Sequence, residues 1–253
     1  MIKLIKADIV RYKCIEREQS FDVEDDVTVL VGMNESGKTS ILESLAKTNY
    51  FEEDDKFSFN MTHDFPRKQK KAADKSGEIP TAVVLHYKVG TEVIEKVHKD
   101  LGLKPLIDTF SITYKYDNNR AWLVSWIKTE EFMKAKTLSL EFEDKCLSDK
   151  LQKVLTKSDF KGILEATKEN VDKKSYSEED IDKLNSLKIY FSDSNSWKDS
   201  PIDEYIVHKY LIPNLPKFMY YDDYYSLPSR VSLTKLEAQP QEPSKKQLKR
   251  YWN

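Results

Sequence analysis

The sequence predicts an α/β fold of the P-loop NTPase type, with an antiparallel β subdomain in its N-terminal lobe and a helical insertion. Three observations predict it. Strand-like runs fill residues 2–31 and return within residues 81–126. A loop of the form G-x-x-x-x-G-K-[ST] joins an apolar run to a helical pattern at residues 32–39. Residues 129–186 are highly charged and have a helical period.

The composition indicates a folded protein with a strongly charged surface. Of the 253 residues, 39% are apolar and 33% are charged, and the aromatic share of 11% argues against wholesale disorder. The net charge of −2 gives no global field that would attract nucleic acid. Any contact with DNA must therefore come from a local basic patch.

The cysteines and the N-terminus bear on where the protein works. Cys14 and Cys146 are far apart and have no CxxC partner, which argues against a zinc ribbon or a disulfide framework. The first eight residues are too few and too charged for a signal peptide. No apolar run approaches the roughly 20 residues that cross a bilayer. We therefore expect a cytoplasmic protein with no membrane contact.

Three strands are expected before the glycine-rich loop. Residues 2–10 alternate in part, and residues 19–23 predict a second strand. After an acidic turn at residues 24–26, the run Val-Thr-Val-Leu-Val at residues 27–31 predicts a buried strand. About 26 residues thus precede the loop strand, and they predict an antiparallel pair.

The first long helix is expected to begin at about Gly37 and to continue through Ala46. Its predicted apolar stripe consists of Ile41, Leu42 and Leu45.

The middle of the chain predicts a long exposed loop followed by more strands. Residues 51–80 are polar, with a basic run at residues 67–71 that either touches phosphodiester backbone or forms a solvated loop face. Residues 117–120 predict a hairpin turn. The expected strands are residues 81–89, 109–116 and 121–126.

Helices dominate the next part of the chain. Leu147, Leu151 and Val154 keep a helical period, and the sequence from Ser177 to Asp180 resembles a capping box. A helix at residues 202–212, a buried strand at 217–221 and a loose tail are expected to follow. The predicted organisation is a P-loop lobe with the β subdomain at 1–128, a helical insertion or arm at 129–200, a return to the lobe at 201–236 and a tail at 237–253.

The glycine-rich loop carries the chemistry. Its glycines let the backbone bend around a phosphate, and its amides together with the helix N-terminus form an anion site. Lys38 is expected to reach the β- and γ-phosphates of ATP and to be the catalytic lysine, and the Thr39 hydroxyl is expected to bind Mg²⁺. The predicted nucleotide-binding residues of this loop are Gly32, Met33, Asn34, Glu35, Ser36, Gly37, Lys38, Thr39 and Ser40.

Other P-loop classes fit less well. Residues 74–77 match the GTPase motif DxxG, and residues 156–159 resemble its guanine-reading NKxD motif. However, DxxG should follow a buried strand, whereas residues 74–77 follow the basic run. A P-loop kinase is disfavoured because kinases of this class commonly have one strand directly before the loop. The β lead-in suits the ATP-binding-cassette type of head.

At this point the sequence resembles a known family. Residues 9–15 (Ile-Val-Arg-Tyr-Lys-Cys-Ile) and the stretch 29–45 around the loop resemble the opening of the RecF/SMC-like ATPases. They look most like the overcoming-lysogenization-defect (OLD) branch and its AAA_15-type relatives. Residues 64–67 and 216–228 resemble that branch more weakly. The resemblance is specific over about residues 1–50.

The resemblance implies a dimeric ATPase head. In such heads ATP lies between two protomers, one of which supplies a signature Ser-Gly motif, and a Walker B Asp-Glu holds Mg²⁺ and activates water. Many OLD relatives carry a TOPRIM nuclease and serve in antiphage defence. By resemblance, Lys13 lies near the ribose or phosphates, and Gln69 is a candidate for the Q-loop role. The implied partners are a second protomer or a higher oligomer, a nuclease or effector chain, and DNA.

The sequence departs from the family pattern in three places. It has no signature motif, no apolar strand that ends in Asp-Glu and no TOPRIM-like acidic cluster. Its nearest imitation of a Walker B strand is residues 218–223. We therefore expect the N-terminal part of such an ATPase. Three functions stay open: an ATPase head, a hydrolysis-deficient ATP-binding assembly switch that needs a partner chain, and, less favoured, a P-loop kinase.

Overall fold

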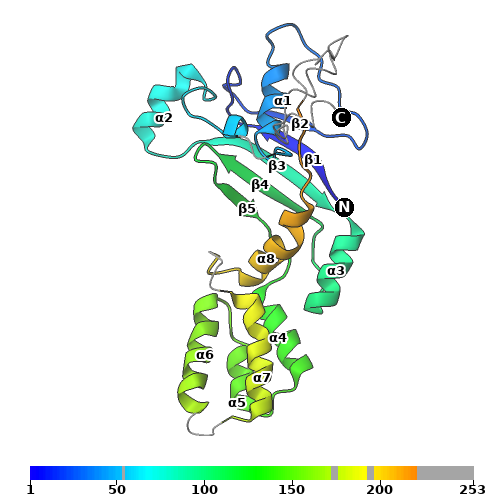
Figure 1. The fold of residues 1–253 in the computed structure, drawn as a ribbon, viewed down its shortest axis with the longest axis vertical. Coiled ribbons are helices and arrows are strands. Elements are labelled where there is room, and N and C mark those ends of the chain that lie inside the picture. Colours follow the sequence, from blue (N-terminus) through cyan, green and yellow to red (C-terminus); the bar gives the residue numbers. More distant parts are fainter. Residues whose placement is uncertain (53–54, 172–175, 193–196, 221–253) are drawn as a thin grey trace, which may run out of the picture. The chain divides into compact units, whose positions relative to one another are not determined.

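A five-stranded antiparallel sheet forms the framework of the fold (Figure 1). The structure is a computed structural model that describes residues 1–52, 55–171, 176–192 and 197–220. The strand order is β2-β1-β3-β4-β5, and every pairing is antiparallel. The strands are β1 (Ile2–Ile9), β2 (Gln19–Asp22), β3 (Thr81–Val89), β4 (Thr109–Lys115) and β5 (Arg120–Leu123).

One face of the sheet carries the apolar core. Ala7, Leu85 and Ile112 lie side by side across β1, β3 and β4, and each is fully buried. A row of buried apolar side chains across neighbouring strands is expected where one face of a sheet is covered. The predicted strands at 2–10, 19–23, 81–89 and 109–116 are confirmed, apart from one or two residues at their ends.

Helices connect some of the strands and follow the sheet along the chain. Two lie close in sequence to its strands: α1 (Lys38–Ala46), which follows the glycine-rich loop, and α3 (Thr91–Leu101), which buries Val93, Val97 and Leu101. The sequence did not predict α3. The remaining helices are α2 (Lys70–Ser76), α4 (Thr129–Leu140), α5 (Lys145–Leu151), α6 (Lys157–Val171), α7 (Glu178–Leu187) and α8 (Pro201–Ile206), which continues into a π-helical turn, η4 (Val207–Leu211).

The expected buried strand at residues 27–31 is wrong. Val27, Val29 and Val31 are 72%, 71% and 90% exposed, and the segment pairs with no strand among the described residues. In Figure 1 the stretch between β2 and α1 is a loop outside the sheet. Strand propensity produces a strand only where a neighbouring strand pairs with the segment, and no described strand pairs with residues 27–31.

Two smaller expectations also need correction. Residues 51–80 are not simply an exposed loop, because they include α2 and bury Phe59, Asp64 and Phe65. Helix α1 buries Ser40 and Ser44, whereas Leu42 of the predicted apolar stripe is 46% exposed.

The end of the described chain only partly matches the expected strand at 217–221. Phe218 forms a single parallel bridge with Tyr50. The rest of the Walker B imitation, residues 221–223, lies outside the described residues, as do the tyrosines beyond it and the tail.

The predicted helical part is confirmed as α4 to α7. The Ser177 hydroxyl accepts the amide of Asp180 at 3.2 Å, which is half of the predicted capping box at the start of α7. The carboxylate of Asp180 is itself buried and accepts the amides of Glu143 and Asp144, each at 2.9 Å. These bonds fix the start of α5 against the start of α7.

Asp100 near the end of α3 joins that helix to α8 and η4. Its Oδ2 accepts hydrogen bonds from Tyr205 at 2.7 Å, Tyr210 at 2.7 Å and Lys209 at 2.9 Å. Burial works against ionisation of Asp100, but these hydrogen bonds outweigh it and hold the pKa of its carboxyl below the ordinary value. The ionised carboxylate therefore stabilises this junction.

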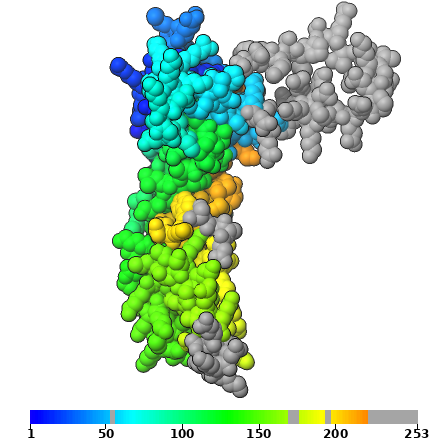
Figure 2. All heavy atoms as spheres, turned by 90° about the vertical axis from the view of Figure 1, so that its left-hand side faces the viewer, coloured from blue at the N-terminus to red at the C-terminus, as the bar shows by residue number. Residues whose placement is uncertain are grey.

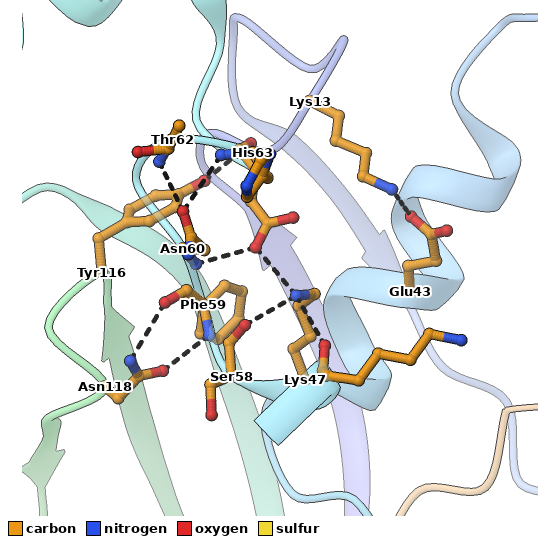
Figure 3. A network of polar contacts seen from close by, with 12 residues as sticks. Lys13, Glu43, Lys47, Ser58, Phe59, Asn60, Thr62, His63, Tyr116 and Asn118 are labelled. Carbon is orange, nitrogen blue, oxygen red and sulfur yellow. Dashed lines mark hydrogen bonds and ion pairs between the residues drawn. The ribbon is translucent and has the colours of Figure 1, made fainter. Parts of the chain in front are cut away.

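A buried ion pair fixes the C-terminal end of α1 (Figure 3). Lys47 Nζ lies 2.9 Å from Asp64 Oδ2, and it also donates to the carbonyl of Ser58 at 2.7 Å and to that of Lys56 at 3.1 Å. The two side chains are only 12% and 5% exposed. The hydroxyl of Tyr116 donates to the carbonyl of Asp64 at 3.1 Å and so ties this group to the sheet.

We expect Lys47→Met to destabilise the protein by about 3 kcal/mol, because it leaves the Asp64 carboxylate buried and unpaired. Chemical denaturation monitored by circular dichroism measures the loss. The matched control is Lys88→Met, whose ion pair with Asp108 spans 3.6 Å between side chains that are 60% and 45% exposed, and which should lose about 0–1 kcal/mol. Equal losses of unfolding free energy in the two variants would contradict a special stabilising role for the buried Lys47–Asp64 pair.

The Asp100 junction predicts a dependence of stability on acid. Because the folded-state pKa of Asp100 is depressed, its contribution is complete above the unfolded value of about 3.9 and is lost as the pH falls from there through the lower folded-state pKa. Asp100→Asn should therefore be less stable at pH 7 and should lose less further stability below about pH 4. Urea unfolding between pH 7 and about pH 3 measures how steeply the free energy of unfolding falls with pH. Asp74→Asn, at an exposed position of α2, is the control.

Candidate functional site

The glycine-rich loop, residues 32–37, forms a tight turn that leads directly into α1. The amide of Ser36 donates to the carbonyl of Met33 at 3.3 Å, and both Glu35 and Gly37 have left-handed backbones, with φ of 64° and 100°. A left-handed residue next to a helix start turns the chain sharply, so the amides of the loop and of the first helical turn lie close together.

Both motif glycines occupy places where a side chain would collide. A Cβ at Gly32 would lie 2.6 Å from Ser36 Oγ, and a Cβ at Gly37 would lie 3.1 Å from Cys14 Sγ. At Gly37 the φ of 100° adds backbone strain for any other residue. The left-handed backbone thus favours glycine at position 37, whereas at position 32 the close atom is the end of a rotatable serine side chain.

The N-terminus of α1 has no side-chain cap. Gly37 is its N-cap residue and forms no capping hydrogen bond, and the carbonyl of Gly37 accepts the amide of Ile41 at 3.0 Å. No acidic residue lies in the first turn. The positive end of the helix is therefore available to an anion such as a phosphate group.

Lys38 folds back over the loop. Its Nζ donates to the carbonyl of Gly32 at 2.8 Å and to that of Met33 at 2.7 Å. These neutral acceptors hold the ammonium group beside the loop, and a phosphate oxygen would be a stronger acceptor for the same group.

A pocket of about 520 Å³ opens at this turn. Thr39 is exposed in it, and the Ser40 hydroxyl lies 3.5 Å from Cys14 Sγ. The residues that line it are Cys14, Asn34, Glu35, Gly37, Lys38, Thr39 and Ser40. Six of the seven are predicted nucleotide-binding residues, so the structure brings most of that set together. Gly32, Met33 and Ser36 shape the turn without lining the pocket.

Cys14 is the pocket residue that the sequence prediction missed as a ligand-facing group. Its only signal was its place within residues 9–15, the first of the two stretches that carried the family resemblance. The turn at residues 12–15, closed by reciprocal hydrogen bonds between Tyr12 and Ile15, brings it beside the helix start.

The two residues taken from the family resemblance make other contacts. Lys13 does not line the pocket. Its ammonium group pairs with Glu43, which lies in α1 about one turn after the pocket residues Thr39 and Ser40 (Figure 3). Gln69 donates its amide to the carbonyl of Glu16 at 2.8 Å and likewise does not line the pocket. The buried Oε1 of Gln69 has no hydrogen-bond partner in the structure.

The remaining sequence signals have structural explanations. Asp74 lies within α2, and Gly77 caps it with a φ of 68°, so the apparent DxxG is a helix end. Asp159 accepts the amides of Leu155 at 3.3 Å and Thr156 at 3.0 Å at the start of α6, which makes the NKxD-like run a helix start.

The basic run is a surface feature. Helix α2 buries none of its residues and faces the viewer in cyan in Figure 2. Arg67 and Lys71 are exposed there, and Lys68 pairs with Glu16 at 2.9 Å.

The residues present fit a magnesium-bound triphosphate. The turn offers amides, one ammonium group and the Thr39 hydroxyl, which are donors and a ligand suited to phosphate oxygens and to Mg²⁺. Within the described part of the chain, no group of three or more His, Cys, Asp or Glu side chains could hold a metal ion by itself. A Mg²⁺ ion at this turn would therefore take the ligands other than Thr39 from phosphate oxygens and water.

No protein-family model matches this chain, and no curated protein is significantly similar to it. In the described ranges, no helix combines the length and the apolar character needed to cross a bilayer.

Gly37→Ala should destabilise the protein by about 1–2 kcal/mol through its left-handed backbone, with a further loss from the 3.1 Å contact with Cys14. Gly77→Ala is the control, because it has a similar backbone, with φ of 68°, and no atom within 4 Å of an added Cβ. Urea denaturation of both variants, and of Gly37→Ala combined with Cys14→Ala, separates the cost of backbone strain from the cost of the contact with Cys14. The assignment fails if Gly37→Ala costs no more than Gly77→Ala.

Proposed function

We propose that this chain binds MgATP at residues 32–40 and is the nucleotide-binding head, or the N-terminal part of one, of an OLD-like antiphage-defence or DNA-repair ATPase. The observation that supports the proposal most strongly is the uncapped start of α1 beside a complete G-x-x-x-x-G-K-[ST] turn. The family assignment rests on the resemblance of residues 9–15 and 29–45, and cytoplasmic location and dimer formation are parts of the same proposal.

Each residue of the turn has a definite role in this proposal. The amides of Gly37, Lys38 and Thr39 donate to phosphate oxygens, and Gly37 leaves room for them. Lys38 exchanges the carbonyls of Gly32 and Met33 for the β- and γ-phosphates. Thr39 contributes its hydroxyl to Mg²⁺, whose charge offsets that of the phosphates.

ATP hydrolysis requires residues beyond those that bind ATP. Water activation in such heads needs a carboxylate near the γ-phosphate, and Glu35 is the one carboxylate that lines the pocket among the described residues. Glu35 lies on the exposed loop itself and not at the end of a strand. This observation favours the second candidate function, a hydrolysis-deficient ATP-binding assembly switch that needs a partner chain.

The two cysteines provide a direct test of nucleotide binding. Cys14 lines the pocket, whereas Cys146 is an exposed cysteine in α5 and serves as an internal control. We expect MgATP to slow alkylation of Cys14 by at least about tenfold and to leave Cys146 unchanged, because a bound triphosphate covers the first thiol. Mass spectrometry of each peptide against time measures both rates in one sample.

The variant Lys38→Ala should abolish this protection, and MgGTP should protect less than MgATP. Phosphate release in the same samples separates the two candidate functions: sustained release supports the ATPase head, and protection without release supports the switch. Equal alkylation of Cys14 with and without MgATP would refute nucleotide binding at this turn.

A further inference from the structure

Three cations follow one line along the surface segment formed by η2 (Arg67–Gln69) and α2, which faces the viewer in cyan in Figure 2. Arg67, Lys71 and Lys75 recur every four residues, so they lie on one side of the segment, about one helical turn apart. All three are exposed, and none forms an ion pair among the described residues. These three residues are called the cationic row below.

Contacts on the other side of the segment hold it against the protein. Gln69 donates its side-chain amide to the carbonyl of Glu16 at 2.8 Å, and Lys68 pairs with the Glu16 carboxylate at 2.9 Å. Ala73 packs against the apolar core. Because these residues take up the inward contacts, the side that carries the cationic row is turned to solvent.

The composition of the segment limits what it can bind. Between Arg67 and Gly77 the sequence holds no aromatic residue and no apolar residue larger than alanine. Protein interfaces are anchored by aromatic and large apolar side chains, and helices that lie on membranes insert such side chains between lipids. Proteins that bind single strands stack aromatic rings on the bases. The backbone of a nucleic-acid duplex, in contrast, is bound by cations alone, which release its condensed counterions.

The length of the cationic row fits such a backbone. Eight residue steps along a helix span about 12 Å. Phosphates of one strand follow each other about every 3.4 Å along the duplex axis, so the row faces about three or four of them. Asp74 is the one carboxylate between residues 67 and 77, and it is exposed next to Lys71 and Lys75. It therefore opposes the approach of phosphates.

The chain's own C-terminal segment is a poor occupant of this surface. Residues 221–253, which lie outside the described residues, carry six basic and four acidic side chains. A segment with a net positive charge is repelled by the cationic row. Its basic cluster at residues 245–250 is a separate place where a polyanion could bind, so the experiment has to distinguish the two.

We propose that the cationic row binds the phosphodiester backbone of double-stranded nucleic acid without reading its sequence. Each of the three side chains neutralises phosphate charge, whereas Lys68 remains paired with Glu16. The row does not line the pocket at the glycine-rich turn, so this inference goes beyond the proposed function and does not require ATP.

Fluorescence anisotropy of labelled duplexes, one of DNA and one of RNA with the same sequence, measures binding by the full chain across a salt series. We expect the triple variant Arg67→Gln/Lys71→Gln/Lys75→Gln to weaken binding to both duplexes at least about tenfold at low salt. The slope of log K against log salt should become shallower by about 2–3, because three phosphate contacts are lost.

The matched control replaces three exposed lysines of the helical part by glutamine, namely Lys145, Lys150 and Lys153. It removes the same charge from the protein and should bind both duplexes within about twofold of the original chain. Equal weakening in the two triple variants would overturn the cationic row, because net charge alone would then explain the affinity.

A single substitution on the same segment should have the opposite effect. Asp74→Asn removes the carboxylate beside Lys71 and Lys75, so we expect it to tighten duplex binding about two- to threefold. A loss of folded protein cannot produce tighter binding, which separates this effect from a structural one. Unchanged or weaker binding by Asp74→Asn would overturn the placement of phosphates on this face.

The other occupants are outcomes of the same experiment. A variant with glutamine at Lys245, Lys246, Lys249 and Arg250 should keep its affinity within about twofold, and loss of binding in it would overturn the proposal. Tighter binding to a single strand of the same length, tighter binding to phosphatidylserine vesicles, or no binding to either duplex would also overturn it.

This inference and the proposed function fail separately. MgATP protection of Cys14 is measured on the variant that lacks the cationic row, which leaves all pocket residues in place. Loss of duplex binding with intact protection supports the row. Duplex binding through the row while MgATP gives no protection leaves the row standing and removes the nucleotide function.

Discussion

The ion pair between Lys47 and Asp64 is the interaction on which the site depends. A buried ammonium group must be fully paired, and here one carboxylate and two carbonyls satisfy it within 3.1 Å. Because Lys47 caps the C-terminal end of α1 and Asp64 is bonded to Tyr116 beside the sheet, the direction of α1 is fixed. The opposite end of the same helix carries the glycine-rich turn, so one buried charge pair helps to position that turn.

The site itself combines rigid and available groups. Gly37 is held against Cys14 and has a backbone conformation that other residues reach only with strain, so the turn has a defined shape. Lys38 donates to two neutral carbonyls of the turn, and the start of α1 has no side-chain cap. Such a site can exchange its internal bonds for phosphate oxygens without rearranging its framework.

The strand-like segments of this region differ in whether their apolar side chains are buried. β1, β3 and β4 bury their apolar face against α3 and other helices, which satisfies the hydrophobic effect for that part of the chain. Residues 27–31 are as apolar as those strands but remain exposed. The described residues therefore leave the segment next to the glycine-rich turn largely exposed.

The sequence by itself determined the features that depend on neighbours along the chain. The strand-like run at residues 81–89 predicted β3, Ser177 predicted the start of α7, and the spacing of Gly32, Gly37 and Lys38 predicted a tight turn before a helix. Only the tertiary structure decided which strand-like segment finds a partner, since that depends on sheet order and not on propensity. It also decided that Cys14 lines the pocket and that Lys47 meets Asp64, because such contacts join residues brought together by the fold and leave no periodic signal in the sequence.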